Sequence, residues 1–146
     1  MTLMNQKKLA IALTVLGIVP FIALTLSAIS GVGTRLLPVA PLVALHAYGA
    51  VIVSFVAGMH WGIHFCKRTE DSIYLISSFI SLLIWLSLVK PGSDLGLTIV
   101  LVSLLLLWAV EYRLSKQRVT TAWFWLMRCA ATSLTCACIV ISIFLP

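Results

Sequence analysis

Residues 47–62 read AYGAVIVSFVAGMHWG, and this stretch decides how the rest of the chain is interpreted. It lies inside a longer apolar segment, residues 41–65, which has the roughly 20 residues that a helix needs to cross the hydrocarbon of a bilayer. Small residues, aromatic rings and histidines interrupt this segment, whereas the other apolar segments are plainer. We therefore look first in this stretch for packing contacts and for function.

The composition indicates that the solvent of the fold is lipid. Of the 146 residues, 62% are hydrophobic and only 10% are charged, and the mean hydropathy is +1.14. A soluble domain of this size leaves too much of its area in water to hide so many apolar side chains. We predict an all-α, polytopic membrane bundle that forms a single domain over residues 1–146, with the lipid bilayer as its first partner.

Five apolar segments are predicted to be transmembrane helices, at residues 9–30, 41–65, 73–89, 94–112 and 121–145. The first is longer than the core of a signal peptide, so we expect it to be retained, and Pro20 in its middle should kink it. Residues 31–38 and 66–71 are predicted connectors. Pro91 and Gly92 should end the third helix, and either Ser93 or Asp94 should cap the fourth.

The basic residues indicate how the bundle is oriented in the membrane. Seven Lys and Arg residues flank the ends of the helices on one side, and two flank the other side: Lys7, Lys8, Lys67, Arg68, Arg113, Lys116 and Arg118, against Arg35 and Lys90. The positive-inside rule then predicts a cytoplasmic amino terminus and an external carboxyl terminus. With this orientation four tryptophans lie toward the cytoplasmic interface and one toward the other: Trp61, Trp108, Trp123 and Trp125, against Trp85.

Several classes of function are not supported by the sequence. The net charge of +6 is spread over short clusters, so no continuous basic face is available for nucleic acid. The four cysteines lack the spacing of a metal site, and we expect them to be small packing residues. No phosphate-binding loop, nucleophile elbow or metalloprotease motif is present. We therefore expect no enzymatic activity, no metal and no cofactor.

The second predicted helix carries two distinctive faces. A helical wheel places six residues on one face, which should point toward protein or a water-filled cavity: His46, Ala50, Val53, Ala57, His60 and His64. Ala47, Ser54, Gly58 and Gly62 fall on a neighbouring face. Gly58 and Gly62 have the four-residue spacing that lets another helix approach closely.

His60 and His64 are one helical turn apart, which allows three interpretations. They could share a metal or haem, take part in a proton relay, or serve a structural role next to Trp61 at the interface. We expect no carboxylate nearby to complete a metal site. His46 is about 20 Å away along the helix and cannot join them.

Arg128 is the charged residue that lies deepest in a predicted helix. Burial of a lone arginine there costs several kcal/mol. Its helix face also carries Thr121, Phe124, Thr132 and Thr135, and we expect this polar seam to face inward. Glu111 lies at a similar depth on the preceding helix, so we infer a contact between Glu111 and Arg128. The alternative is that Arg128 extends to the head groups without a partner.

Three motifs together resemble a family of uncharacterised small multi-pass membrane proteins, found in bacteria and with mitochondrial relatives. They are the Tyr-Gly-Ala…Ser-Phe…His-Trp-Gly pattern from Tyr48 to Gly62, the Gly-x-x-Pro-Phe pattern from Gly17 to Phe21, and the aromatic-then-arginine pattern from Trp123 to Arg128. The resemblance implies a location in the bacterial inner membrane. It singles out Tyr48, His60, Trp61 and Arg128, and it implies no reaction.

We expect the protein to be a non-enzymatic accessory or assembly component of a membrane complex, in contact with a protein partner or with a second copy of itself. A small transporter or proton-conducting protein is the alternative, in which the stripe of His60 and His64 and the Arg128 seam line a cavity near the kink at Pro20. A membrane haem protein would depend on the histidines alone.

Overall fold

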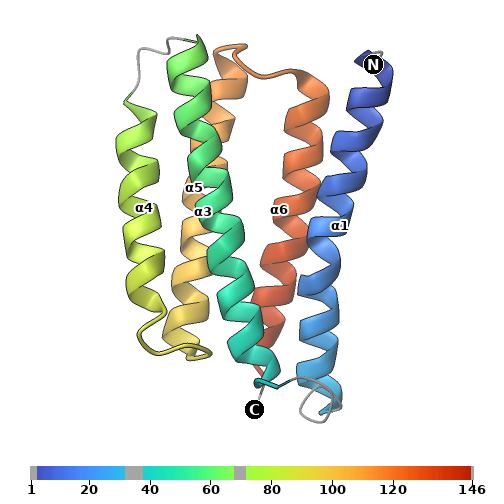
Figure 1. The fold of residues 1–146 in the computed structure, drawn as a ribbon, viewed down its shortest axis with the longest axis vertical. Coiled ribbons are helices and arrows are strands. Elements are labelled where there is room, and N and C mark those ends of the chain that lie inside the picture. Colours follow the sequence, from blue (N-terminus) through green and yellow to red (C-terminus); the bar gives the residue numbers. More distant parts are fainter. Residues whose placement is uncertain (1–2, 32–37, 68–71, 146) are drawn as a thin grey trace.

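A computed structural model describes residues 3–31, 38–67 and 72–145, and it folds them into five α-helices without a strand (Figure 1). The helices are α1 (Leu3–Ser30), α3 (Pro41–Lys67), α4 (Ile73–Ser87), α5 (Asp94–Lys116) and α6 (Ala122–Ile143). The predicted all-α class is confirmed. Most of the predicted connectors at residues 31–38 and 66–71 lies outside the described residues.

Four of the helices, α1, α3, α5 and α6, are long and apolar enough to cross a membrane, which fits a membrane protein. The exception is α4, which has only 15 residues. We predicted that this segment continues to Val89, but the helix ends at Ser87. The amide groups of Leu88 and Val89 donate to carbonyl groups only three residues back, at 3.1 and 3.2 Å, so the last turn tightens and the helix stops before the proline.

The helices lie side by side along the long axis of the molecule, with α4 and α1 at its two edges and α3, α5 and α6 between them (Figure 1). We call the upper end in Figure 1, which contains the amino terminus and the α5–α6 connection, the amino-terminal end. The carboxyl terminus and the α4–α5 turn lie at the opposite, carboxy-terminal end. In that turn Ser93 is the N-cap of α5, because its hydroxyl accepts a hydrogen bond from the Gly96 amide at 3.2 Å.

The core lies where α3 packs against α4 and α5. Its buried side chains are apolar and include Val53, Val56, Ala57, Ile80, Ile84, Val100, Leu104 and Leu107. Two glycines allow α3 and α5 to approach closely. A Cβ atom on Gly49 would lie 2.8 Å from Val100 Cγ1, and one on Gly96 would overlap the His46 ring. These glycines, rather than those we singled out in the sequence, pack the helices of this chain.

Gly58 and Gly62 do not pack against another helix in the part of the chain that the structure describes. Both are exposed, and apart from the adjoining residues and backbone of α3 itself, no described atom lies within 4 Å of the position that a Cβ would occupy at either residue. The described part of the chain does not supply the helix that this spacing lets approach, so a close contact at these glycines stays a prediction. The two glycines do lie on one exposed side of α3, but the neighbouring helices of the bundle pack on its other sides.

Candidate functional site

The candidate site begins at His60 of α3, whose side chain is fully buried against α4 and α5. Its Nδ1 atom lies 2.8 Å from the hydroxyl oxygen of Ser77, which is equally buried on α4. A buried imidazole needs such a partner, because a polar group removed from water without a hydrogen bond is costly. The predicted inward stripe is confirmed for five of its six residues, since His46, Ala50, Val53 and Ala57 are also buried, whereas His64 is half-buried.

Glu111 of α5 is the second member of this site. Its side chain is 2% exposed, and its Oε1 atom lies 3.8 Å from His60 Nε2. We expected no carboxylate near His60, and this expectation is wrong. The two residues are 51 positions apart, and only the packing of α3 on α5 brings them together.

Arg128 of α6 completes the group. Its Nε atom donates to both carboxylate oxygens of Glu111, at 2.9 and 3.1 Å, so the side chain pairs inward and does not extend to the head groups. Thr132 and Thr135 are buried on the same helix, whereas Thr121 is exposed, so only the deeper part of the predicted polar seam faces inward. Ser77, His60, Glu111 and Arg128 form one polar network, which links α4, α3, α5 and α6.

The polar network is confined to the amino-terminal end of the bundle. Toward the other end, the core between His60 and His46 consists of apolar side chains such as Val53, Val100 and Leu104. Within the described residues, the buried hydroxyl of Ser103 has no hydrogen-bond partner and does not extend the network. The arrangement is suited to holding four helices together, through an ion pair between α5 and α6, a polar contact between α3 and α5, and a hydrogen bond between α3 and α4.

The remaining histidine of the predicted pair lies in a different environment. The His64 ring packs against the Tyr74 ring, with centroids 4.7 Å apart. Next to it, the Trp61 indole donates to the Ser78 hydroxyl at 3.0 Å. No group of three or more His, Cys, Asp or Glu side chains converges in the described part of the chain. Ser54, another predicted member of the cluster, is exposed on α3 and lies apart from the polar network.

A second contact joins α1 to α3 near Pro20. Proline has no backbone N–H, so the preceding turn of α1 lacks one of its hydrogen bonds. The hydroxyl of Tyr48 donates to the Gly17 carbonyl in this turn at 2.9 Å. The Phe21 and Tyr48 rings also meet edge to face, with centroids 5.1 Å apart. Tyr48 therefore supports the loosened turn of α1 from the neighbouring helix.

Replacement of Tyr48 by phenylalanine tests this contact. The variant keeps the ring contact but loses the hydrogen bond, so we expect the free energy of unfolding to fall by about 0.5–1.5 kcal/mol. Thermal unfolding in a mild detergent measures the change. Tyr112→Phe is the matched control, since Tyr112 is 45% exposed. Equal stability of the two variants would show that the hydroxyl of Tyr48 contributes nothing.

A third polar group, which sequence analysis missed, surrounds His46 at the carboxy-terminal end. The Gly92 amide donates to His46 Nδ1 at 3.1 Å, which makes Nε2 the protonated nitrogen. Nε2 then donates to the Ser87 hydroxyl at 2.9 Å, and this hydroxyl donates to the Ile84 carbonyl at 2.6 Å. Gly92 has φ +75°, a conformation that favours glycine. His46 thus holds the α4–α5 turn against α3.

A comparison of the sequence with known protein families gives a match, which spans nearly the whole bundle. A family model described as a protein of unknown function, DUF3429, matches residues 6–144, which include all three polar contacts. The chain belongs to the DUF3429 family. The predicted resemblance to an uncharacterised family is thereby confirmed. No curated protein and no solved structure matches the chain.

The function of this DUF3429 protein must therefore be argued from its own geometry. The polar network, the Tyr48 contact and the His46 contact each join different helices. The polar side chains that stand out in the sequence of this DUF3429 protein, such as Arg128, Tyr48 and His46, thus form contacts between its helices.

Proposed function

We propose that this protein is a non-enzymatic, multi-pass accessory or assembly component of a complex in the bacterial inner membrane, with its amino-terminal end in the cytoplasm. The orientation is supported by basic residues at that end of the bundle: Lys7 and Lys8 in the first two turns of α1, Arg113 and Lys116 in the last turn of α5, and Arg118 just after it. Lys90 is in the turn at the opposite end.

The observation that carries the proposal is the uncovered face of α3. Its exposed small residues, Ala47, Ser54, Gly58 and Gly62, are called the small-residue face. Glycine inside a helix lowers its stability by about 1 kcal/mol relative to alanine, and no helix of this chain uses the space that these glycines leave. In a bilayer such space favours close packing of a second helix. The occupant that we propose is a transmembrane helix of a partner protein.

The aromatic border of this face supports the same assignment. Trp61 is 44% exposed and Phe65 is 63% exposed, and both lie at the amino-terminal end of the face. Large aromatic side chains beside a small-residue groove are typical anchors for a partner. Because α3 also forms the centre of the bundle, a partner that packs there would contact the most firmly held helix of the protein.

Proton conduction is the second candidate, and the contact between His60 and Glu111 favours it. An imidazole 3.8 Å from a carboxylate inside a membrane protein is a common element of proton relays. The apolar core between His60 and His46 weighs against this function, because a relay needs polar groups across the whole membrane.

The proposal predicts that the partner is lost when the small-residue face is filled. The protein, tagged at its amino terminus, is extracted from its native membrane in a mild detergent, and its native mass is measured. We expect one stoichiometric protein partner with the wild type and with Ala109→Leu, an exposed alanine on α5. Gly58→Leu/Gly62→Leu should lose most of this partner without losing the folded bundle.

Two results would contradict the proposal. A native mass that corresponds to the protein alone, or to copies of the protein alone, would exclude a heterologous partner. Retention of the partner by Gly58→Leu/Gly62→Leu would show that the small-residue face is not the contact. Proton flux into vesicles containing the purified protein, abolished by His60→Ala, would favour the second candidate.

A further inference from the structure

The edge of the bundle between α1 and α6 contains a cleft that the polar contacts described above do not explain. Helix α1 is loosely packed: only 11% of the residues in its most apolar 18-residue segment are buried, against 44% in that of α5. Two cavities follow this edge. The deeper one has a volume of about 460 Å³ and lies between α1, α3 and α6, and the outer one has about 560 Å³. Ala10 lines both, so we treat them together as the α1–α6 cleft.

The deeper part of the α1–α6 cleft is apolar, with charge at one place. Side chains such as Leu13, Ile52 and Phe124 line it, together with Arg128. Glu111 engages only the Nε atom of Arg128. Among the described residues, no protein acceptor binds the two Nη groups. The Nη groups of Arg128 are therefore N–H donors available to a ligand in the deeper part of the cleft. Apart from Thr14, Thr132 and Thr135, the other residues that line this part are apolar.

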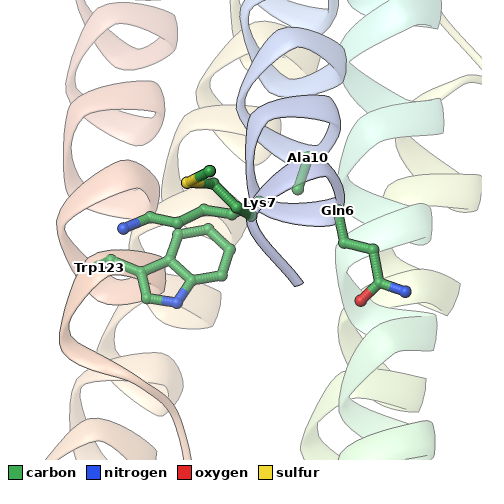
Figure 2. Close-up of a pocket in the computed structure, with 5 residues that line it drawn as sticks. Gln6, Lys7, Ala10 and Trp123 are labelled. Atoms are coloured by element: carbon green, nitrogen blue, oxygen red, sulfur yellow. The ribbon is translucent and has the colours of Figure 1, made fainter. Parts of the chain in front are cut away.

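The outer part of the α1–α6 cleft has the character of a head-group site. The Lys7 side chain extends across the Trp123 ring, with Nζ 5.3 Å from the ring centroid, and Gln6 lies on the other side of α1 (Figure 2). Tryptophan and lysine prefer the level of the lipid head groups. Arg128 is five residues further along α6, which places it roughly 7–8 Å deeper than Trp123.

We propose that the α1–α6 cleft binds one anionic phospholipid. The phosphate contacts the Lys7 ammonium group at the outer part, beside the Trp123 ring. The ester carbonyls accept hydrogen bonds from the Arg128 Nη groups. One acyl chain fills the deeper part beside Thr14, Gly17 and Phe21.

Charge complementarity and shape together select this ligand. A soluble anion would not need the apolar chamber, and a zwitterionic lipid such as phosphatidylcholine would bring the cation of its own head group close to Lys7. Basic pockets between membrane helices on the cytoplasmic side are a known type of binding site for anionic lipid head groups. The proposal is independent of the partner helix, because the small-residue face lies on α3.

The test measures lipid binding to the purified full-length protein by native mass spectrometry. Phosphatidylglycerol and phosphatidylcholine with identical acyl chains are added to delipidated protein in a mild detergent. We expect a single phosphatidylglycerol to bind at least about fivefold more tightly than phosphatidylcholine, and Lys7→Gln to remove about fivefold in affinity, the contribution of one basic residue near an anionic surface. Lys8→Gln is the control with the same change in charge, and it should bind like the wild type.

A second pair of variants tests the deeper part of the cleft. Ala10→Phe places a ring where the two cavities meet and should reduce phosphatidylglycerol binding more than tenfold. Ala12→Phe, on the exposed side of α1, should not change it. Equal binding of the two lipids would overturn the head-group assignment. Equal loss in Lys7→Gln and Lys8→Gln would indicate general attraction of charge, and unchanged binding by Ala10→Phe would exclude the cleft.

Discussion

Replacement of Arg128 by leucine is expected to reduce the amount of folded protein in the membrane sharply and to lower the free energy of unfolding by about 3–5 kcal/mol. The reason is that Glu111, only 2% exposed, loses the cation that neutralises it. His60 remains near one carboxylate oxygen, but at 3.8 Å it makes a weaker contact than the hydrogen bonds of Arg128 at 2.9 and 3.1 Å. Quantitative blotting of membranes and thermal unfolding in detergent measure the two effects.

Two controls separate the loss of the ion pair from the loss of charge. Arg113→Leu removes the same charge from an exposed position at the amino-terminal end and should have little effect. Glu111→Leu/Arg128→Leu removes both partners and should recover much of the lost stability, since an apolar pair leaves no buried charge. A fully stable Arg128→Leu variant would show that the ion pair does not hold α5 to α6.

Replacement of Gly96 by alanine is expected to have the second large effect. A Cβ atom there would overlap the ring of His46, which Ser87 and Gly92 fix on both sides. The ring cannot move without losing these hydrogen bonds. We expect the free energy of unfolding to fall by at least the ~1–3 kcal/mol that overpacking costs. Chemical or thermal unfolding in detergent provides the measurement.

Gly58→Ala is the matched control for this prediction. It makes the same substitution in a helix where no atom lies within 4 Å of the new Cβ, and it should leave the isolated bundle as stable or up to about 1 kcal/mol more stable. His46→Ala/Gly96→Ala should be less destabilised than the sum of its single variants, because the small side chain removes the overlap. A Gly96→Ala variant as stable as the wild type would refute the close contact.

The sequence predicted the helices well because a membrane-spanning helix must satisfy its backbone within itself, which requires a long apolar run. The apolar segments that form α1, α3 and α6 can be recognised as helices from the sequence without knowledge of how the helices pack. The end of α4 was less predictable. A proline signals where a helix cannot continue, but the amide groups of Leu88 and Val89 had already closed the last turn.

The candidate site was predicted in part. A charge as deep in a helix as that of Arg128 requires a partner, because a lone buried charge is costly. Glu111 was the acidic residue at the same depth, so the ion pair could be predicted. The contact between His60 and Glu111 was missed because periodicity describes one helix at a time and does not show which neighbour a face meets. The same limit explains why Gly49 and Gly96 were overlooked, whereas the exposed Gly58 and Gly62 were expected to pack.

The shortness of α4 has a consequence for the surrounding lipid. Its 15 residues extend for about 22 Å, whereas the hydrocarbon layer that suits the four longer helices is about 30 Å thick. With the bundle placed across a bilayer as proposed above, lipids next to α4 would have to shorten or tilt their chains, at a modest cost that grows with each ångström of mismatch. His46 lets the chain turn early by satisfying polar groups of the turn. In the proposed placement the flank of α4 would then be a locally thinned patch of bilayer. Proteins with similarly short helices would be drawn to that flank.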